Sequence, residues 1–200
     1  DLHSFPTRRS SDLHIASAVA SHYDGRYQNI AEMKTSGVEL AVSHAFHTGI
    51  GTFSPSIGAN YITDLDARAA STTPEQQLFD RIFTPARLRV HGGLSWSNAS
   101  ISTALAASYI NSYENNTLTP SVGIDEWITF DWHLQYDIGE HHPSAILRGL
   151  TVALDVQNVM DEDPPRVTVP PTLQTFDFGY DATNASAMGR FISLQLSKRW

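Results

Sequence analysis

Two short clusters of titratable residues are the places in this sequence where a metal ion would find ligands. His141 and His142 are adjacent, so on a strand their side chains would point to opposite faces, and a solvated turn explains them better than a metal site. Asp161, Glu162 and Asp163 offer oxygen ligands to calcium, but the glycine-containing spacing of a calcium loop is absent. A solvated loop explains this second cluster better, and we expect no metal site.

A third group raises the question of acid–base chemistry. Asp131 and His133 lie two residues apart, so on a strand they would share one face, as a proton relay requires. Packing of that face against another part of the protein is the better interpretation. The sequence contains neither a nucleophile elbow nor a glycine-rich phosphate loop. We therefore predict that the chain is not an enzyme, has no catalytic residues and uses no cofactor.

The elements that position these residues are strands, because apolar residues recur with a period of two from residue 14 onward. In the run from residue 127 to 136, for example, Ile128, Phe130 and Trp132 alternate with polar residues. Short turns and long, proline-containing segments separate the runs. The pattern predicts an all-β fold, an antiparallel up-and-down meander of about seven or eight strands. The predicted strands cover residues 14–23, 37–46, 52–63, 87–96, 99–109, 127–136, 150–158 and 189–200.

The last predicted strand is typical of an outer-membrane β-barrel. It places Ile192, Leu194 and Leu196 on one face and ends on the aromatic Trp200. We predict that these four residues form the signal read by the barrel-assembly machinery. No run of 18 apolar residues occurs, so a closed barrel is the way in which this chain could span a bilayer.

The polar faces of the strands favour a barrel over a soluble sandwich. Charged residues make up 17% of the chain, against about 25% in a soluble domain, and the polar faces carry mostly small uncharged residues. Short and long connections alternate, with long loops predicted over 66–85, 114–124 and 159–187. Because transmembrane barrels have short periplasmic turns, the C-terminus is expected on the periplasmic side. A net charge of −8 without a basic patch excludes a nucleic-acid surface.

The C-terminal third resembles TonB-dependent outer-membrane receptors. Two stretches carry the resemblance, "LDVQNVMDEDPP" and "YDATNASAMGRFISLQLSKRW", supported upstream by "NIAEMKTSGVELAVSHAF". Together they extend over residues 23–200. The motif positions are Asn158, Asp161, Pro164, Pro165, Tyr180, Asp181, Asn184, Gly189 and Arg190.

The resemblance implies part of a barrel of about 22 strands, filled by an N-terminal plug and energised by TonB. Residues 14–200 are expected to be an incomplete C-terminal segment of that barrel. Residues 1–13 match the in-frame translation of a common sequencing adapter, so we expect an artefactual leader. The alternatives are a small complete outer-membrane barrel, an enzyme among them, and a soluble β-sandwich binding module.

For the intact receptor, the resemblance implies ligand-gated uptake of a scarce large solute across the outer membrane of a Gram-negative cell. The solute could be a siderophore, cobalamin, a glycan or a similar nutrient. The expected partners are outer-membrane lipid, the barrel-assembly machinery and, through the plug, TonB. Ligand contacts are expected in the three long loops, where no individual residue stands out.

Overall fold

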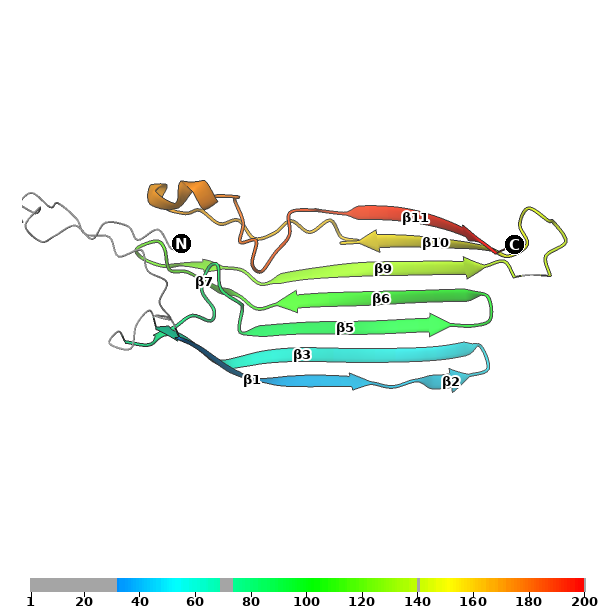
Figure 1. The fold of residues 1–200 in the computed structure, drawn as a ribbon, viewed down its shortest axis with the longest axis horizontal. Coiled ribbons are helices and arrows are strands. Elements are labelled where there is room, and N and C mark those ends of the chain that lie inside the picture. Colours follow the sequence, from blue (N-terminus) through cyan, green and yellow to red (C-terminus); the bar gives the residue numbers. More distant parts are fainter. Residues whose placement is uncertain (1–31, 69–73, 140, 200) are drawn as a thin grey trace, which may run out of the picture. The chain divides into compact units, whose positions relative to one another are not determined.

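A computed structural model describes residues 32–68, 74–139 and 141–199 of the chain. Seven of its strands follow one another in an antiparallel meander, in the order β1-β3-β5-β6-β9-β10-β11 (Figure 1). The predicted strand 14–23, the leader 1–13 and Trp200 lie outside the described residues. The seven strands are β1 (Glu32–Ser43), β3 (Gly51–Arg68), β5 (Leu88–Ser97), β6 (Ile101–Ile110), β9 (Trp127–Asp137), β10 (Leu150–Gln157) and β11 (Phe191–Lys198).

The remaining elements are short. β2 (Phe46–Thr48) and β4 (Gln76–Gln77) both pair with β3 and complete a nine-stranded sheet. β7 (Tyr113–Asn115) and β8 (Val122–Ile124) form a separate two-stranded sheet. The 3-10 helix η3 (Pro171–Phe176) lies between β10 and β11. Within the described chain, β1 and β11 do not pair with each other, so the sheet is open.

The predicted all-β meander is confirmed, with local differences in the bounds of its elements; β1, for example, begins at Glu32 rather than at residue 37. β3 continues to Arg68 and so includes the first residues of the predicted loop 66–85. β7 and β8 form a hairpin over residues 113–124, which occupies the predicted loop 114–124. The turn between β5 and β6 occupies residues 98–100 rather than 97–98, because the Asn98 side chain accepts the N–H groups of Ser100 and Ile101.

Strand register gives the sheet one apolar face. Directly opposed residues of antiparallel neighbours share a face, and Leu94 of β5 opposes both Pro55 and Leu105. Continuing across the sheet, Leu105 opposes Trp132, which in turn opposes Val156. An unbroken apolar row therefore crosses the sheet. Further apolar members of this face include Val42, Ile57, Leu134, Leu154, Leu194 and Leu196.

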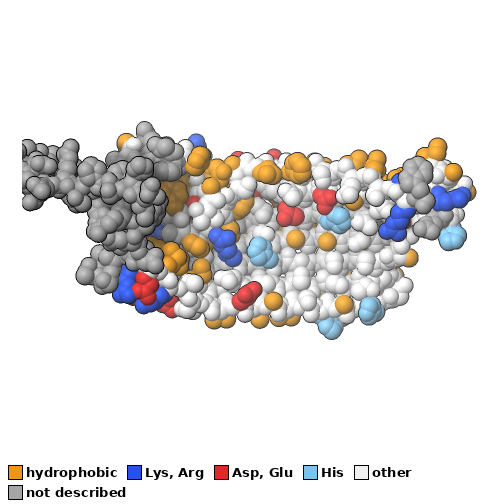
Figure 2. All heavy atoms as spheres, in the orientation of Figure 1, with side chains coloured by type: hydrophobic (Ala, Val, Ile, Leu, Met, Phe, Trp, Pro, Cys, Tyr) orange, Lys and Arg blue, Asp and Glu red, His pale blue; other side chains and the backbone are white. Residues whose placement is uncertain are grey.

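The opposite face is polar and sparsely charged. One of its rows contains Ser54, Ser95, Ala104, His133 and Asp155 in direct opposition. Figure 2 shows this face, on which uncharged side chains and backbone predominate and a few charged and His side chains lie over the middle strands. The two faces of the sheet thus differ sharply in polarity.

The apolar face is exposed rather than buried. Leu105 is 49% exposed in the middle of β6, and Leu194 is 66% exposed in β11. Within the described ranges, the small β7–β8 sheet does not join the large sheet, and no second large sheet exists to form a sandwich. Because large uncovered apolar patches are unfavourable in water, this face requires an apolar surrounding such as lipid.

Candidate functional site

The long connections gather at one end of the sheet. In the described residues they are the segments 74–87, 111–126 and 158–190, whereas the connections 49–50, 98–100, 138–139 and 141–149 lie at the other end. Figure 1 shows β7 and the 3-10 helix at the first end, which we call the loop end, and the chain turns at the second, which we call the turn end. The loops in which ligand contacts were expected are therefore brought to one end of the molecule.

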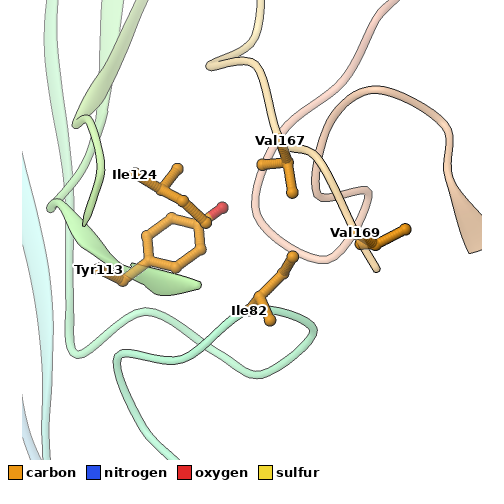
Figure 3. Close-up of a cluster of buried hydrophobic side chains, with 5 residues drawn as sticks. All are labelled: Ile82, Tyr113, Ile124, Val167 and Val169. Carbon is orange, nitrogen blue, oxygen red and sulfur yellow. The ribbon is translucent and has the colours of Figure 1, made fainter. Parts of the chain in front are cut away.

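A small hydrophobic core holds the three long loops together. Ile82 comes from the first loop, Tyr113 and Ile124 from the second and Val167 and Val169 from the third. Their side chains are drawn in Figure 3, and each is at most 7% exposed. Because each loop contributes buried apolar area, removing any one of them would expose the others to water. The loop end is therefore packed around a buried apolar core, as a small domain in water is.

Asp181, a position of the family motif, is the most buried polar residue beside this core. It is 1% exposed, and its carboxylate accepts hydrogen bonds from loops far apart in sequence. Oδ2 accepts the backbone N–H of Phe83 at 3.2 Å and the side-chain amide of Asn184 at 2.9 Å. Oδ1 accepts the N–H of Thr183 at 2.9 Å. A buried carboxylate requires such donors, so Asp181 fixes the third loop to the first.

Asn184, another motif position, extends the same network to the large sheet, which we call the wall. Its Oδ1 accepts the N–H of Ala86 at 3.1 Å and the guanidinium of Arg89, the second residue of β5, at 2.6 Å. Its Nδ2 donates to the carbonyl of Thr84 at 2.8 Å. We call Asp181, Asn184 and Arg89 the loop latch, because they join the third loop to the first loop and to the start of β5.

The phenol of Tyr113 is the titratable group most affected by these surroundings. Burial raises the pKa of Tyr113 well above its ordinary value, and the adjacent negative charge of Asp181 raises it further. The uncharged phenol is therefore the stable form in the folded loop end.

Asp80 orders the first loop against the second. Its Oδ1 accepts the N–H of Arg87 at 2.8 Å and the side-chain amide of Asn111 at 3.0 Å. The Asp80 backbone adopts φ 55°, as does Phe83 at φ 64°, in the left-handed region that non-glycine residues seldom occupy. The loop is thus held in an uncommon conformation by contacts with its neighbours.

Two hollows flank this ordered loop. A polar groove of about 750 Å³ is lined by Phe79, Asp80, Arg81, Glu114 and Asp125, among others. A smaller apolar hollow of about 420 Å³ is lined by Phe83, Leu173, Phe178, Ala182 and Thr183. These volumes lie in the range of small-molecule sites. The loop end can therefore offer a ligand both charged and apolar contacts.

The other motif residues tie together the two ends of the third loop. The Asn158 side chain exchanges hydrogen bonds with the backbone of Glu162, at 2.9 Å in each direction. Asp161 Oδ1 accepts the N–H of Arg190 at 2.7 Å, directly after Gly189, whose φ of 65° suits glycine. Pro164 and Pro165 are half-buried in the same loop. The hydrogen bonds of Asn158 and Asp161 thus stabilise the two ends of the third loop.

The predicted assembly-signal residues lie on the exposed face of the last described strand. Ile192, Leu194 and Leu196 are between 60% and 66% exposed. The remaining member, Trp200, falls outside the described residues. The recognition of these residues by the assembly machinery stays a prediction.

His133 and Asp131 do not pair with each other. His133 Nδ1 lies 2.6 Å from Asp155 Oδ1 on β10, while Asp131 Oδ1 accepts the N–H of Asn158 at 2.8 Å. The sequence spacing suggested a contact between His133 and Asp131 on the same strand. His133 instead contacts Asp155, which lies directly opposite it on the neighbouring strand β10. Asp155, which the sequence reasoning missed, was detectable only through strand register.

The described residues form neither a cluster of metal ligands nor an apolar helix of membrane-spanning length. Three or more His, Cys, Asp or Glu side chains do not converge anywhere in this part of the chain. His142 Nδ1 accepts the N–H of Ser144 at 3.2 Å, which holds that ring within its own turn. No described helix has the length and apolarity needed to cross a membrane.

Comparison with known proteins gives one family match. Residues 6–159 match the family model described as "TonB dependent receptor-like, beta-barrel". The match begins within the predicted leader and ends just after Asn158, before the remaining C-terminal motif positions. No curated protein matches the chain. Since the match covers more than half of the sequence, it assigns the strands to a receptor-like β-barrel rather than to a soluble β-sandwich.

Proposed function

Because the chain belongs to the TonB-dependent receptor β-barrel family, we propose that its loop end captures a scarce large solute outside the cell. The solute class comprises siderophores, cobalamin, glycans and similar nutrients. Uptake is ligand-gated and energised by TonB through a plug enclosed by the barrel wall. Proteins of this family are receptors and transporters of the outer membrane, not enzymes.

The observation that carries the proposal is the division of the sheet between a tightly ordered loop end and a turn end. Long loops of transmembrane barrels face the outside, and short turns face the periplasm. The turn end also carries Lys198 and Arg199, the last residues described. On this orientation the C-terminus is periplasmic, and the polar groove beside Asp80 and Arg81 opens toward the external medium.

The family as a whole interacts with TonB and with outer-membrane lipid. We further propose that Ile192, Leu194, Leu196 and Trp200 are read by the barrel-assembly machinery when the receptor inserts. Within the described residues, the sheet is open at β1 and at β11. This supports a wall that is completed by further strands in the intact receptor, because unpaired strand edges are not tolerated in the hydrocarbon region.

Single-cysteine labelling in intact cells tests the orientation. The chain contains no cysteine, so Asn116→Cys in the β7–β8 hairpin and Ala99→Cys in the β5–β6 turn each introduce one thiol. Both positions are exposed. With the full-length receptor in the outer membrane, a membrane-impermeant maleimide is expected to label Cys at 116 and to reach Cys at 99 only after permeabilisation. The reverse pattern would overturn the proposed orientation.

Transport is tested separately, with candidate solutes supplied one at a time. Cells with and without the receptor are given a ferric siderophore, cyanocobalamin or an oligosaccharide, in strains that contain or lack TonB. Receptor-dependent and TonB-dependent accumulation of one solute supports the proposal. Accumulation that persists without TonB would contradict gated active transport.

A further inference from the structure

The connection between β9 and β10 differs from the other connections at the turn end. It extends from residue 138 to 149, whereas its neighbours occupy 49–50 and 98–100. Its tip presents Ile146, which is 79% exposed, the largest exposed fraction among the large hydrophobic residues described. The adjacent Leu147 is 38% exposed. The tip of this connection therefore presents two apolar side chains at the turn end of the sheet.

Lys198 indicates on which side of the sheet this tip lies. Lys198 opposes Leu150 and follows Leu196 by two residues, so its side chain leaves β11 on the apolar face. Its Nζ donates to the carbonyls of Ala145 and Ile146, each at 2.8 Å. The tip of the turn is therefore fixed on the apolar, lipid-facing side of the sheet.

Arg148 places a second positive charge beside this tip. It is exposed, and its Nε donates to the carbonyl of His142 at 3.2 Å. Its terminal guanidinium nitrogens have no hydrogen-bond partner among the described residues. A guanidinium held at Nε with its outer nitrogens available is suited to a phosphate group.

Among the described residues, the carboxylate near this turn is that of Asp137, which lies on the other face. Asp137 opposes Thr151 in the polar rows, and together with His141 and Arg199 it lines a hollow of about 360 Å³. Residues 141–149 contain no carboxylate, and Glu140 lies outside the described residues. On the apolar face, by contrast, Lys198 contacts the backbone of Ala145 and Ile146. The described lipid-facing side therefore combines apolar and cationic groups.

We propose that residues 141–149, together with Lys198, bind the headgroup of an anionic phospholipid in the periplasmic leaflet. Ile146 and Leu147 enter the boundary between headgroups and acyl chains, and Arg148 contacts the phosphate. Lys198 holds the turn in place through the carbonyls of Ala145 and Ile146. Such a contact anchors the rim of the wall between β9 and β11, as interfacial cationic and apolar residues do in other membrane proteins.

Native mass spectrometry of the detergent-solubilised full-length receptor tests this site. Phosphatidylglycerol and phosphatidylethanolamine with identical acyl chains are titrated, and the lipid-bound fractions are compared. One basic side chain near a lipid surface contributes about fivefold in affinity. We expect about a tenfold preference for phosphatidylglycerol. The preference should fall to about twofold or less in the double variant Ile146→Ser, Arg148→Gln.

A matched pair at the loop end provides the control. In the third loop, Met160 is 68% exposed and Arg166 is exposed. The double variant Met160→Ser, Arg166→Gln therefore removes one exposed apolar and one exposed basic side chain at the loop end. It should keep the tenfold preference for phosphatidylglycerol. Heat-modifiable electrophoretic mobility verifies that each barrel is folded. If the double variant does not fold, Arg148→Gln alone is compared, with about a fivefold loss expected.

Equal binding of the two lipids by the unmodified receptor, or an unchanged preference in the Arg148 variants, would overturn the proposal. The site rests on the proposed orientation, which places the turn end in the periplasmic leaflet. The two failures are distinguishable. Cysteine labelling at position 99 reports the orientation, whereas the lipid preference reports the site itself.

Discussion

The loop end and the wall of this protein are stabilised by different surroundings. Of the eight buried hydrophobic residues described, only Leu65 and Ala153 belong to the seven long strands, and the others lie in the loops or in β7 and β8. In the wall, large apolar residues such as Leu105 and Leu194 remain exposed. The loops therefore bury apolar side chains away from water, while the wall presents them outward to lipid.

This contrast shows why burial alone would mislead in a membrane barrel. Apolar strand residues such as Leu105 and Leu194 are exposed, because the solvent on that side is hydrocarbon. Where the loops meet, polar residues such as Asp181 and Asn184 are buried together with the apolar core. Perturbations of the two regions should consequently have separate effects.

The largest effect is expected from a charge on the lipid face. Leu105→Arg in the middle of β6 should destabilise the folded receptor by about 2–4 kcal/mol, the cost of a basic side chain near the bilayer midplane. Urea unfolding of the full-length receptor in lipid vesicles, followed by tryptophan fluorescence, measures this loss. Ala106→Arg is the matched control.

Ala106 adjoins Leu105, is also exposed, and opposes Asp131 on the polar face. Its replacement by Arg should change the free energy of unfolding by less than about 1 kcal/mol, because the charge stays in a polar lumen. Equal destabilisation by the two substitutions would contradict the assignment of the faces.

Next in size is the loss of the loop latch. Asp181→Ala leaves the donors of Phe83, Thr183 and Asn184 without their carboxylate, at a cost of about 2–3 kcal/mol to the loop end. Hydrogen exchange should accelerate at the amides of residues 83 and 183. Amides of β6 and β9 should exchange at their original rates, and acceleration there would show that the two regions are coupled.

A smaller, pH-dependent effect is expected at Tyr113. Its raised pKa means that the folded loop end favours the neutral phenol, so this contribution to stability is complete below about pH 10 and declines as the pH rises further. As the pH is raised above about 10, the loops should become more sensitive to an alkaline protease. Tyr113→Phe should reduce this increase, and an identical increase in both proteins would count against a buried neutral phenol.

The wall could be predicted from the sequence, because each strand carries its own period-two pattern. The pattern identified the strands and the two faces, as the run with Ile128, Phe130 and Trp132 illustrates. It could not identify the partner of His133, because that contact depends on how β9 is aligned with β10. Register is determined by pairing between strands rather than by either strand alone.

The loop end could not be predicted in the same way, because its contacts connect distant residues without periodicity. The hydrogen bond between Ala86 and Asn184, for example, spans 98 positions. Asp181 and Asn184 were identified only as motif positions of a resembling family, without a structural role. The pairing of β7 with β8 was missed because both strands are three residues long, too short for a pattern to indicate.

The central claim is that one face of the sheet contacts lipid and the other does not. The direct test places an environment-sensitive fluorophore on Leu105→Cys and, separately, on Ala106→Cys in the full-length receptor, reconstituted with lipids brominated on their acyl chains. Bromine quenches fluorophores that contact the hydrocarbon. We predict strong quenching at position 105 and little at position 106, whereas equal quenching at both positions, or the reverse order, would contradict the account.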